Sequence, residues 1–199
     1  LAKTYIDAGE PEKAVNFLKA QLASRFGTTE ERMIKIGLAV ALYKNGSNAN
    51  AQREFDSLIQ SEKDSFTLIN IASKLPFIND SQARKTSERI LKENVLSKNP
   101  NSVGAMTLLA TLYQISGRSD DSIPYYKRVL ELQPENKEVI NNLAWLLSED
   151  KGMLQEALKL AQKGLKLYPN YTDLLDTTGV IYYKLGEFDK AVEYFDKCI

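Results

Sequence analysis

Adjacent carboxylates are the side chains in this sequence best suited to acid–base chemistry. Glu30–Glu31 and Asp120–Asp121 each lie where a helix is expected to begin. Two carboxylates can act as general acid and general base when both face one cleft, but neighbouring residues on a helix point apart. Acidic side chains near a helix N-terminus are favoured by the helix dipole. We therefore expect both pairs to stabilise helix starts.

The sequence has few residues suited to nucleophilic catalysis or metal binding. The sequence has no histidine, and Cys198 is its single cysteine. This composition removes the commonest general base and metal ligand, any internal disulfide and any cysteine-based zinc cluster. The phosphate-loop motifs GxxxxGK and GxGxxG and the nucleophile motif GxSxG are missing from the sequence. We expect Cys198 to be a small core residue in the intact array and not a nucleophile, and we predict no enzyme activity, no cofactor and no metal site.

The charge balance limits the class of partner. Lys plus Arg and Asp plus Glu number 26 each among 199 residues, so the formal net charge is zero. A neutral chain lacks the basic footprint that nucleic acids and anionic membranes attract. No stretch approaches 18 consecutive apolar residues, so no membrane insertion is expected. Three Asn-x-Ser/Thr tripeptides, at Asn45, Asn79 and Asn170, fall in expected turns, where these residues are common for conformational reasons.

One ten-residue stretch occurs nearly twice. GEPEKAVNFL spans 9–18 and GEFDKAVEYF spans 186–195, and the offset of 186 − 9 = 177 residues is five units of about 35 residues. The segment 103–136 shows what one unit encodes, because apolar residues recur at helical spacing on both sides of Gly117. Asp120 is the expected N-cap of the second helix, with Pro124 in its first turns, and Pro134 ends it.

This pattern resembles the tetratricopeptide repeat, an antiparallel helix pair of about 34 residues. The resemblance covers essentially the whole chain as a single array. Its expected units are 1–31 (partial), 32–65, 66–102 (degenerate), 103–136, 137–171 and 172–199 (partial). It implies an all-α, right-handed α-solenoid in which small residues such as Ala110, Ala144 and Gly179 let helices approach closely. An irregular helical bundle is the alternative.

Two features depart from the repeat pattern. In 66–102, Pro76 cuts the first helix short, and SQARKTSERILKENVLSK predicts a second helix longer than its counterparts. This unit is either an ordinary degenerate repeat or a kink in the superhelix. The second departure is at the ends, because the chain starts midway through a helix and resembles a fragment of a longer array. Val192, Phe195 and Ile199 are expected to lie uncovered on the last helix, so we predict end-to-end self-association.

The resemblance also implies a function, which is to hold an extended segment or helix of a protein partner in the concave groove. Helical spacing places one set of residues on the face that lines this groove. The expected groove residues are Tyr43, Lys74, Thr111, Gln114, Asn141, Trp145 and Tyr183, and the last unit adds Asp173 and Asp176 to the same face. Trp145, the single tryptophan, is the expected anchor, because an aromatic ring gives large contact area at low entropic cost. Alternatively, its ring lies sideways against the adjacent repeat.

The sequence lacks the binding motifs of two specialised branches of the family. Chaperone adaptors hold a carboxylate with Lys then Asn on successive turns, and no matching pair has that order: Ile36/Val40, Asn70/Lys74, Thr107/Thr111, Asn141/Trp145 and Asp176/Val180. Glycosyltransferase-linked arrays carry an asparagine ladder, and only Asn142 fits among Gly37, Ile71, Leu108, Asn142 and Thr177. Both specialised functions are therefore disfavoured.

The run 140–170 also resembles bacterial arrays of exosortase and exopolysaccharide systems, which are often carried on envelope lipoproteins. The sequence thus predicts a non-catalytic scaffold for a protein or peptide partner. The alternatives are a docking or regulatory region of a larger enzyme, or a part of a bacterial envelope polysaccharide or protein-sorting system. The compartment stays open between cytoplasm and bacterial periplasm or envelope.

Overall fold

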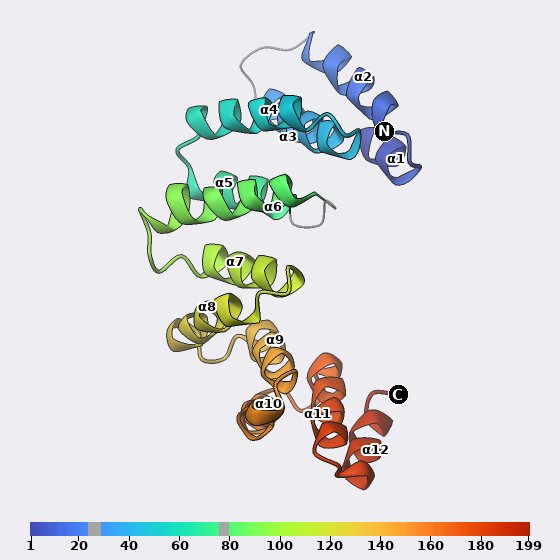
Figure 1. Ribbon diagram of the computed structural model, residues 1–199, viewed down its shortest axis with the longest axis vertical. Coiled ribbons are helices and arrows are strands. Elements are labelled where there is room, and N and C mark those ends of the chain that lie inside the picture. The colour runs from blue at the N-terminus through green and yellow to red at the C-terminus, as the bar shows by residue number, and fades with distance from the viewer. Residues whose placement is uncertain (24–28, 76–79) are drawn as a thin grey trace. The chain divides into compact units, whose positions relative to one another are not determined.

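Helices make up all the regular structure in the described residues. The computed structural model describes residues 1–23, 29–75 and 80–199 (Figure 1). Its helices are α1 (Ala2–Asp7), α2 (Pro11–Leu22), α3 (Thr29–Lys44), α4 (Asn48–Ser61), α5 (Ser65–Ser73), α6 (Ser81–Arg89), η1 (Ile90–Leu96), α7 (Val103–Ile115), α8 (Ser119–Leu132), α9 (Lys137–Ser148), η2 (Lys151–Met153), α10 (Leu154–Leu167), α11 (Thr172–Lys184) and α12 (Phe188–Asp196). Within these residues every helix is too short or too polar to serve as a membrane span.

The turns inside four of the helix pairs are built alike. Gly9, Gly46, Gly117 and Gly186 all have φ between 71° and 79°. At Gly117 the left-handed backbone lets the Arg118 N–H reach back to the Tyr113 carbonyl oxygen at 2.9 Å, which ends the first helix. The same bond, from the residue after the glycine to the carbonyl five residues earlier, follows the other three glycines. The recurring turn is the structural form of the sequence repeat.

The start of α8 differs from its prediction. The helix begins at Ser119 with Arg118 at the N-cap, so Asp120 lies in the first turn and the N-cap assignment was wrong. The turn at Gly117 returns the chain to helical geometry two residues earlier than expected. Asp120 and Asp121 still place acidic charge in the first turn, as Glu30 and Glu31 do in α3. Pro124 falls inside α8, beyond its first turn.

The chain forms two compact units, Leu1–Ala105 and Met106–Ile199. Within each unit, helices pack mainly on neighbours in the sequence, as α3 does on α4 and α11 on α12. This is the packing of an α-solenoid and not of an irregular bundle, so the predicted fold class is confirmed. The division into one array of six repeats stays a prediction.

The N-terminal unit contains the degenerate repeat. Helix α5 has nine residues, whereas α3 has 16, and Pro76 lies outside the described residues. Its partner is longer than usual, because α6 continues without a break into the π-helical η1 and ends at Leu96. The buried Ser87 hydroxyl donates to the Ala72 carbonyl oxygen at 3.0 Å and joins the two helices of this pair.

Close helix contacts at glycines hold the C-terminal unit together. A Cβ on Gly164 would lie 2.6 Å from side-chain atoms of both Ile140 and Leu174. A Cβ on Gly179 would lie 2.5 Å from the Phe195 ring, which rests on the backbone of α11. Phe195 is therefore only partly exposed, and the open apolar face predicted for the last helix is smaller than expected. End-to-end association stays a prediction.

Candidate binding site in the C-terminal unit

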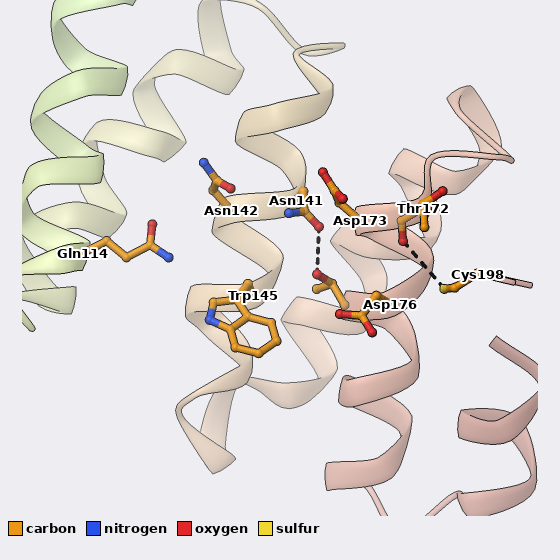
Figure 2. Close-up of a pocket in the computed structure, with 9 residues that line it drawn as sticks. Gln114, Asn141, Asn142, Trp145, Thr172, Asp173, Asp176 and Cys198 are labelled. Atoms are coloured by element: carbon orange, nitrogen blue, oxygen red, sulfur yellow. Dashed lines mark hydrogen bonds between the residues drawn. The ribbon is translucent and has the colours of Figure 1, made fainter. Parts of the chain in front are cut away.

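A hollow of about 500 Å³ lies in the C-terminal unit, lined mainly by α9 and α11 (Figure 2). These are the first helices of two successive pairs, which the repeat pattern assigned to the groove. Gln114 at the end of α7 and Cys198 beyond α12 complete its border. Its lining residues are Gln114, Asn141, Asn142, Trp145, Thr172, Asp173, Asp176, Thr177 and Cys198.

The amide of Asn141 is held in one orientation by a buried hydroxyl. Thr177 is 2% exposed, and its Oγ1 donates to Asn141 Oδ1 at 2.8 Å (Figure 2). This bond engages the amide oxygen and leaves the Nδ2 group for the hollow. Within residues 1–23, 29–75 and 80–199, Asn141 Nδ2 donates to no acceptor. Asn141 therefore presents N–H donors in a fixed direction.

A second buried hydroxyl orients Gln114 in the same way. Tyr126 is fully buried between α7 and α9, and its hydroxyl donates to Gln114 Oε1 at 3.0 Å. The Tyr126 hydroxyl oxygen also accepts from Asn142 Nδ2 at 3.4 Å and lies 3.0 Å from Thr111 Oγ1. Burial raises the pKa of Tyr126, so this hydroxyl stays neutral and can donate. In Figure 2 the Gln114 nitrogen points toward the hollow.

Trp145 supplies the exposed aromatic surface of the hollow. Its side chain is 37% exposed, and the indole nitrogen lies on the side of the ring nearer Gln114 (Figure 2). Lys184 Nζ lies 5.6 Å from the ring centroid and is held by Glu149 Oε1 at 2.6 Å and the Ser148 carbonyl oxygen at 3.2 Å. The ring thus offers apolar area and an indole N–H next to the amide groups of Gln114 and Asn141.

Two carboxylates line the opposite wall. Asp173 and Asp176 are three residues apart on one face of α11, and both are exposed. In the parts of the chain that the structure describes, neither has an ion-pair partner. Tyr171 stands beside them, and burial, its hydrogen bond to Asp173 and the charges of Asp173 and Glu138 raise its pKa to about 12.

Cys198 lies at the border of the hollow and not in the core. Its side chain is partly exposed, and Sγ lies 3.4 Å from the Tyr194 carbonyl oxygen and 3.8 Å from that of Thr172. The thiol sits where α12 meets the start of α11, and its expected core position in an intact array stays a prediction. Desolvation and, next, the charge of Asp176 raise the pKa of this thiol, which keeps it protonated.

The predicted groove residues fall into different surroundings. Gln114, Asn141 and Trp145 come together at the hollow. Thr111 does not line it, but its hydroxyl lies within hydrogen-bond distance of the Tyr126 hydroxyl, which orients Gln114. Tyr183 is 61% exposed but contacts Phe188 at a centroid distance of 5.6 Å and borders a separate hollow.

The two predicted groove residues of the N-terminal unit do not join this site. Lys74 is the exposed C-cap of α5. Tyr43 is 4% exposed, stacks on Phe55 at 5.8 Å and donates to Gln52 Oε1 at 2.9 Å, so its assignment to an open groove was wrong. The ring lies between the helices of its own pair, because helix-face spacing places such a residue only to within about one position.

Thr177 and Asn142 belong to the site although they were not predicted as binding residues. Each follows a predicted groove residue directly in the sequence, Thr177 after Asp176 and Asn142 after Asn141. The sequence signal for both was a polar residue directly after a predicted groove residue, at the edge of the same helix face. Spacing alone does not show that a hydroxyl on α11 contacts an amide on α9.

Family models for the tetratricopeptide repeat match residues 103–136, 125–159 and 177–199. Together with the fold, these matches show tetratricopeptide repeats in residues 103–159 and 177–199.

Curated relatives match about half of the chain. One is the general transcriptional corepressor trfA of Dictyostelium discoideum, 33% identical over 107 residues, which are 52% of this chain and 8% of the relative. Another is cellulose synthase operon protein C of Pseudomonas fluorescens (strain SBW25), 28% identical over 106 residues, 52% of this chain and 8% of the relative. The chain therefore spans about a tenth or less of these relatives. They come from both eukaryotes and bacteria, so a bacterial origin is not shown.

Solved structures share the fold at low sequence identity. A crystal structure of MamA is 16% identical with a TM-score of 0.67, covering 87% of this chain and 94% of MamA. YrrB, described as a TPR protein with an unusual peptide-binding site, is 20% identical with a TM-score of 0.61, covering 86% of this chain and 87% of YrrB. At this identity, the likeness shows the fold alone.

Proposed function

We propose that this protein is a non-catalytic scaffold that binds an extended segment of a protein partner in the hollow between α9 and α11. The observation that carries the proposal is the pair of amides, on Gln114 and Asn141, whose oxygens are engaged by the Tyr126 and Thr177 hydroxyls. Their N–H groups are left for a ligand. Carbonyl oxygens of an extended peptide are acceptors of the matching kind.

Preorganisation makes this binding favourable. The amides are already oriented before a ligand arrives, so less side-chain entropy is lost on association. Trp145 adds a half-exposed ring at the edge of the donors, the kind of residue that contributes most to many interfaces. The protonated thiol of Cys198 supports a binding role over nucleophilic catalysis.

The wider setting of the scaffold is a second part of the proposal. The relative in Pseudomonas fluorescens is a cellulose synthase operon protein, which favours a role in a bacterial envelope polysaccharide system. A docking or regulatory region of a larger enzyme is the alternative setting. In either case the hollow would hold a partner segment, and end-to-end association of the chain would extend the scaffold.

Selection of binders from a displayed library of random peptides tests the proposal. We expect selected peptides to change the fluorescence of Trp145 and to bind Trp145→Ala about tenfold more weakly or worse. Leu132→Ala is the matched control, because Leu132 is also 37% exposed but lies outside the hollow. Peptides that leave Trp145 emission unchanged and bind both variants like the parent would contradict the proposed site.

A further inference from the structure

Resting on the proposed function, we infer that the partner segment is basic and places an arginine or lysine side chain between Asp173 and Asp176. The occupant is thereby a peptide with a cationic residue at the centre of its bound stretch. Its backbone carbonyls meet the amides of Gln114 and Asn141 on the other wall. Three features of the hollow carry this inference.

The first feature is the division of the hollow into two walls of different chemistry. The α7 and α9 side carries neutral N–H donors, whereas the α11 side carries two carboxylates three residues apart. Donors suit the carbonyls of a peptide backbone, and carboxylates suit a cationic side chain. An extended peptide can use both walls at once, because alternate side chains leave its backbone in opposite directions.

The second feature is that the carboxylates of the hollow lack a cation within the described protein. Many other carboxylates of this unit have one: Glu131 with Arg128, Glu149 with Lys184, Glu156 with Lys127, Glu187 with Lys190 and Glu193 with Lys197. Two lysines of this unit are already engaged by other groups. Lys184 is bound to Glu149, and Lys137 lies against Glu138 and over the Tyr171 ring. Asp173 and Asp176 are therefore open to a cationic side chain of a partner.

The third feature is the position of Trp145 relative to Asp176. In Figure 2 the indole ring and the Asp176 carboxylate face the same space. A guanidinium group is planar, so it can bond a carboxylate through its edge and lie against an aromatic ring with its face. A lysine ammonium group is a point charge, so it can pair with the carboxylate but cannot lie flat against the ring. The geometry therefore favours arginine over lysine. A peptide ending in a free carboxylate would instead meet like charge.

Four libraries of nine-residue peptides, identical except for a central Arg, Lys, Gln or Glu, test the inference. We expect the Arg library to bind the full chain most tightly, followed by Lys, with the Glu library weakest. Asp173→Asn with Asp176→Asn should weaken binding of Arg peptides about tenfold, which corresponds to about 1.4 kcal/mol, and should reduce the salt dependence of their affinity. Asp173→Lys with Asp176→Lys should make Glu peptides the preferred class.

The control is Asp189→Asn with Asp196→Asn, which changes the net charge equally at two exposed positions of α12 outside the hollow. It should alter affinity by less than about twofold. Equal binding of all four libraries, or a preference for Glu, overturns the proposed preference for basic peptides. If Trp145→Ala still weakens peptide binding in that case, the peptide site itself stands. Binding that is unaffected by Trp145→Ala in every library overturns the site itself.

Discussion

At the scale of the residue, two buried hydroxyls decide what the hollow can bind. Thr177 and Tyr126 each engage an amide oxygen, on Asn141 and Gln114, and so turn the amide nitrogens outward. Without these bonds either amide would rotate and offer a mixture of donors and acceptors. The specificity of the site thus depends on two hydroxyl groups that belong to buried residues.

The pKa of Tyr171 reports on the neighbouring carboxylate of Asp173. This pKa of about 12 in the folded protein lies above the ordinary tyrosine value of 10.0, mainly through burial and then through Asp173. The folded state holds this proton more tightly, so the stabilisation is fully present below pH 10 and is lost as the pH rises toward 12. We expect the tyrosinate absorbance of the parent minus that of Tyr171→Phe to have its midpoint near pH 12.

Asp173→Asn provides the companion measurement. It removes a carboxylate that raises the pKa of Tyr171 but leaves the burial, so the midpoint should move partway toward 10. A difference titration with its midpoint at the ordinary tyrosine value in the parent would contradict the proximity of the ring to Asp173.

At the scale of the element, Gly179 sets how closely α12 packs on α11. A Cβ there would lie 2.5 Å and 2.7 Å from two atoms of the Phe195 ring. Gly179→Ala must displace this ring, and we expect the free energy of unfolding to fall by about 1–3 kcal/mol. Chemical denaturation followed by circular dichroism measures the change.

Gly37→Ala is the matched control for this prediction. Gly37 also lies inside a helix, but its Cβ would make only ordinary contacts of 3.6–3.7 Å with Leu18. Alanine is a better helix former than glycine, so the free energy of unfolding should stay equal or rise by up to about 1 kcal/mol. Equal destabilisation by both substitutions would mean that the contact with Phe195 is not the cause.

At the scale of the whole molecule, stability is local. Helices of each unit pack mainly on their neighbours in the sequence, so a unit contains most of the contacts that it needs. We therefore expect a fragment of residues 103–199, which keeps α7 through α12, to fold without the rest of the chain. Its far-ultraviolet circular dichroism should be helical, and its urea transition should be cooperative.

The same fragment shows whether the C-terminal unit folds by itself or needs contacts with the rest of the chain. If the C-terminal unit folds independently, the fragment should bind the selected peptides with the affinity of the full chain, since the lining of the hollow lies within it. A fragment that loses its helicity or its cooperative transition would show that contacts outside 103–199 are required. Gly179→Ala should then affect the single transition of the complete chain.

The sequence by itself determined the helix pairs and the fold class. Apolar residues at helical spacing and turn glycines act over a few residues, and a solenoid needs little more than contacts between neighbours. For this reason the segment 103–136 could be assigned from its sequence, with α7 and α8 inside it. Four turn glycines have the left-handed backbone that their position in the repeat requires.

Only the tertiary structure decided which polar groups remain open for a partner. Thr177 and Asn141 are 36 residues apart, yet their bond fixes the donor wall, and Tyr43 is buried although its helix position suggested an open face. Whether a side chain is engaged depends on distances between helices. Helical spacing determines the direction of a side chain from its own axis, and the neighbouring helix determines what it meets.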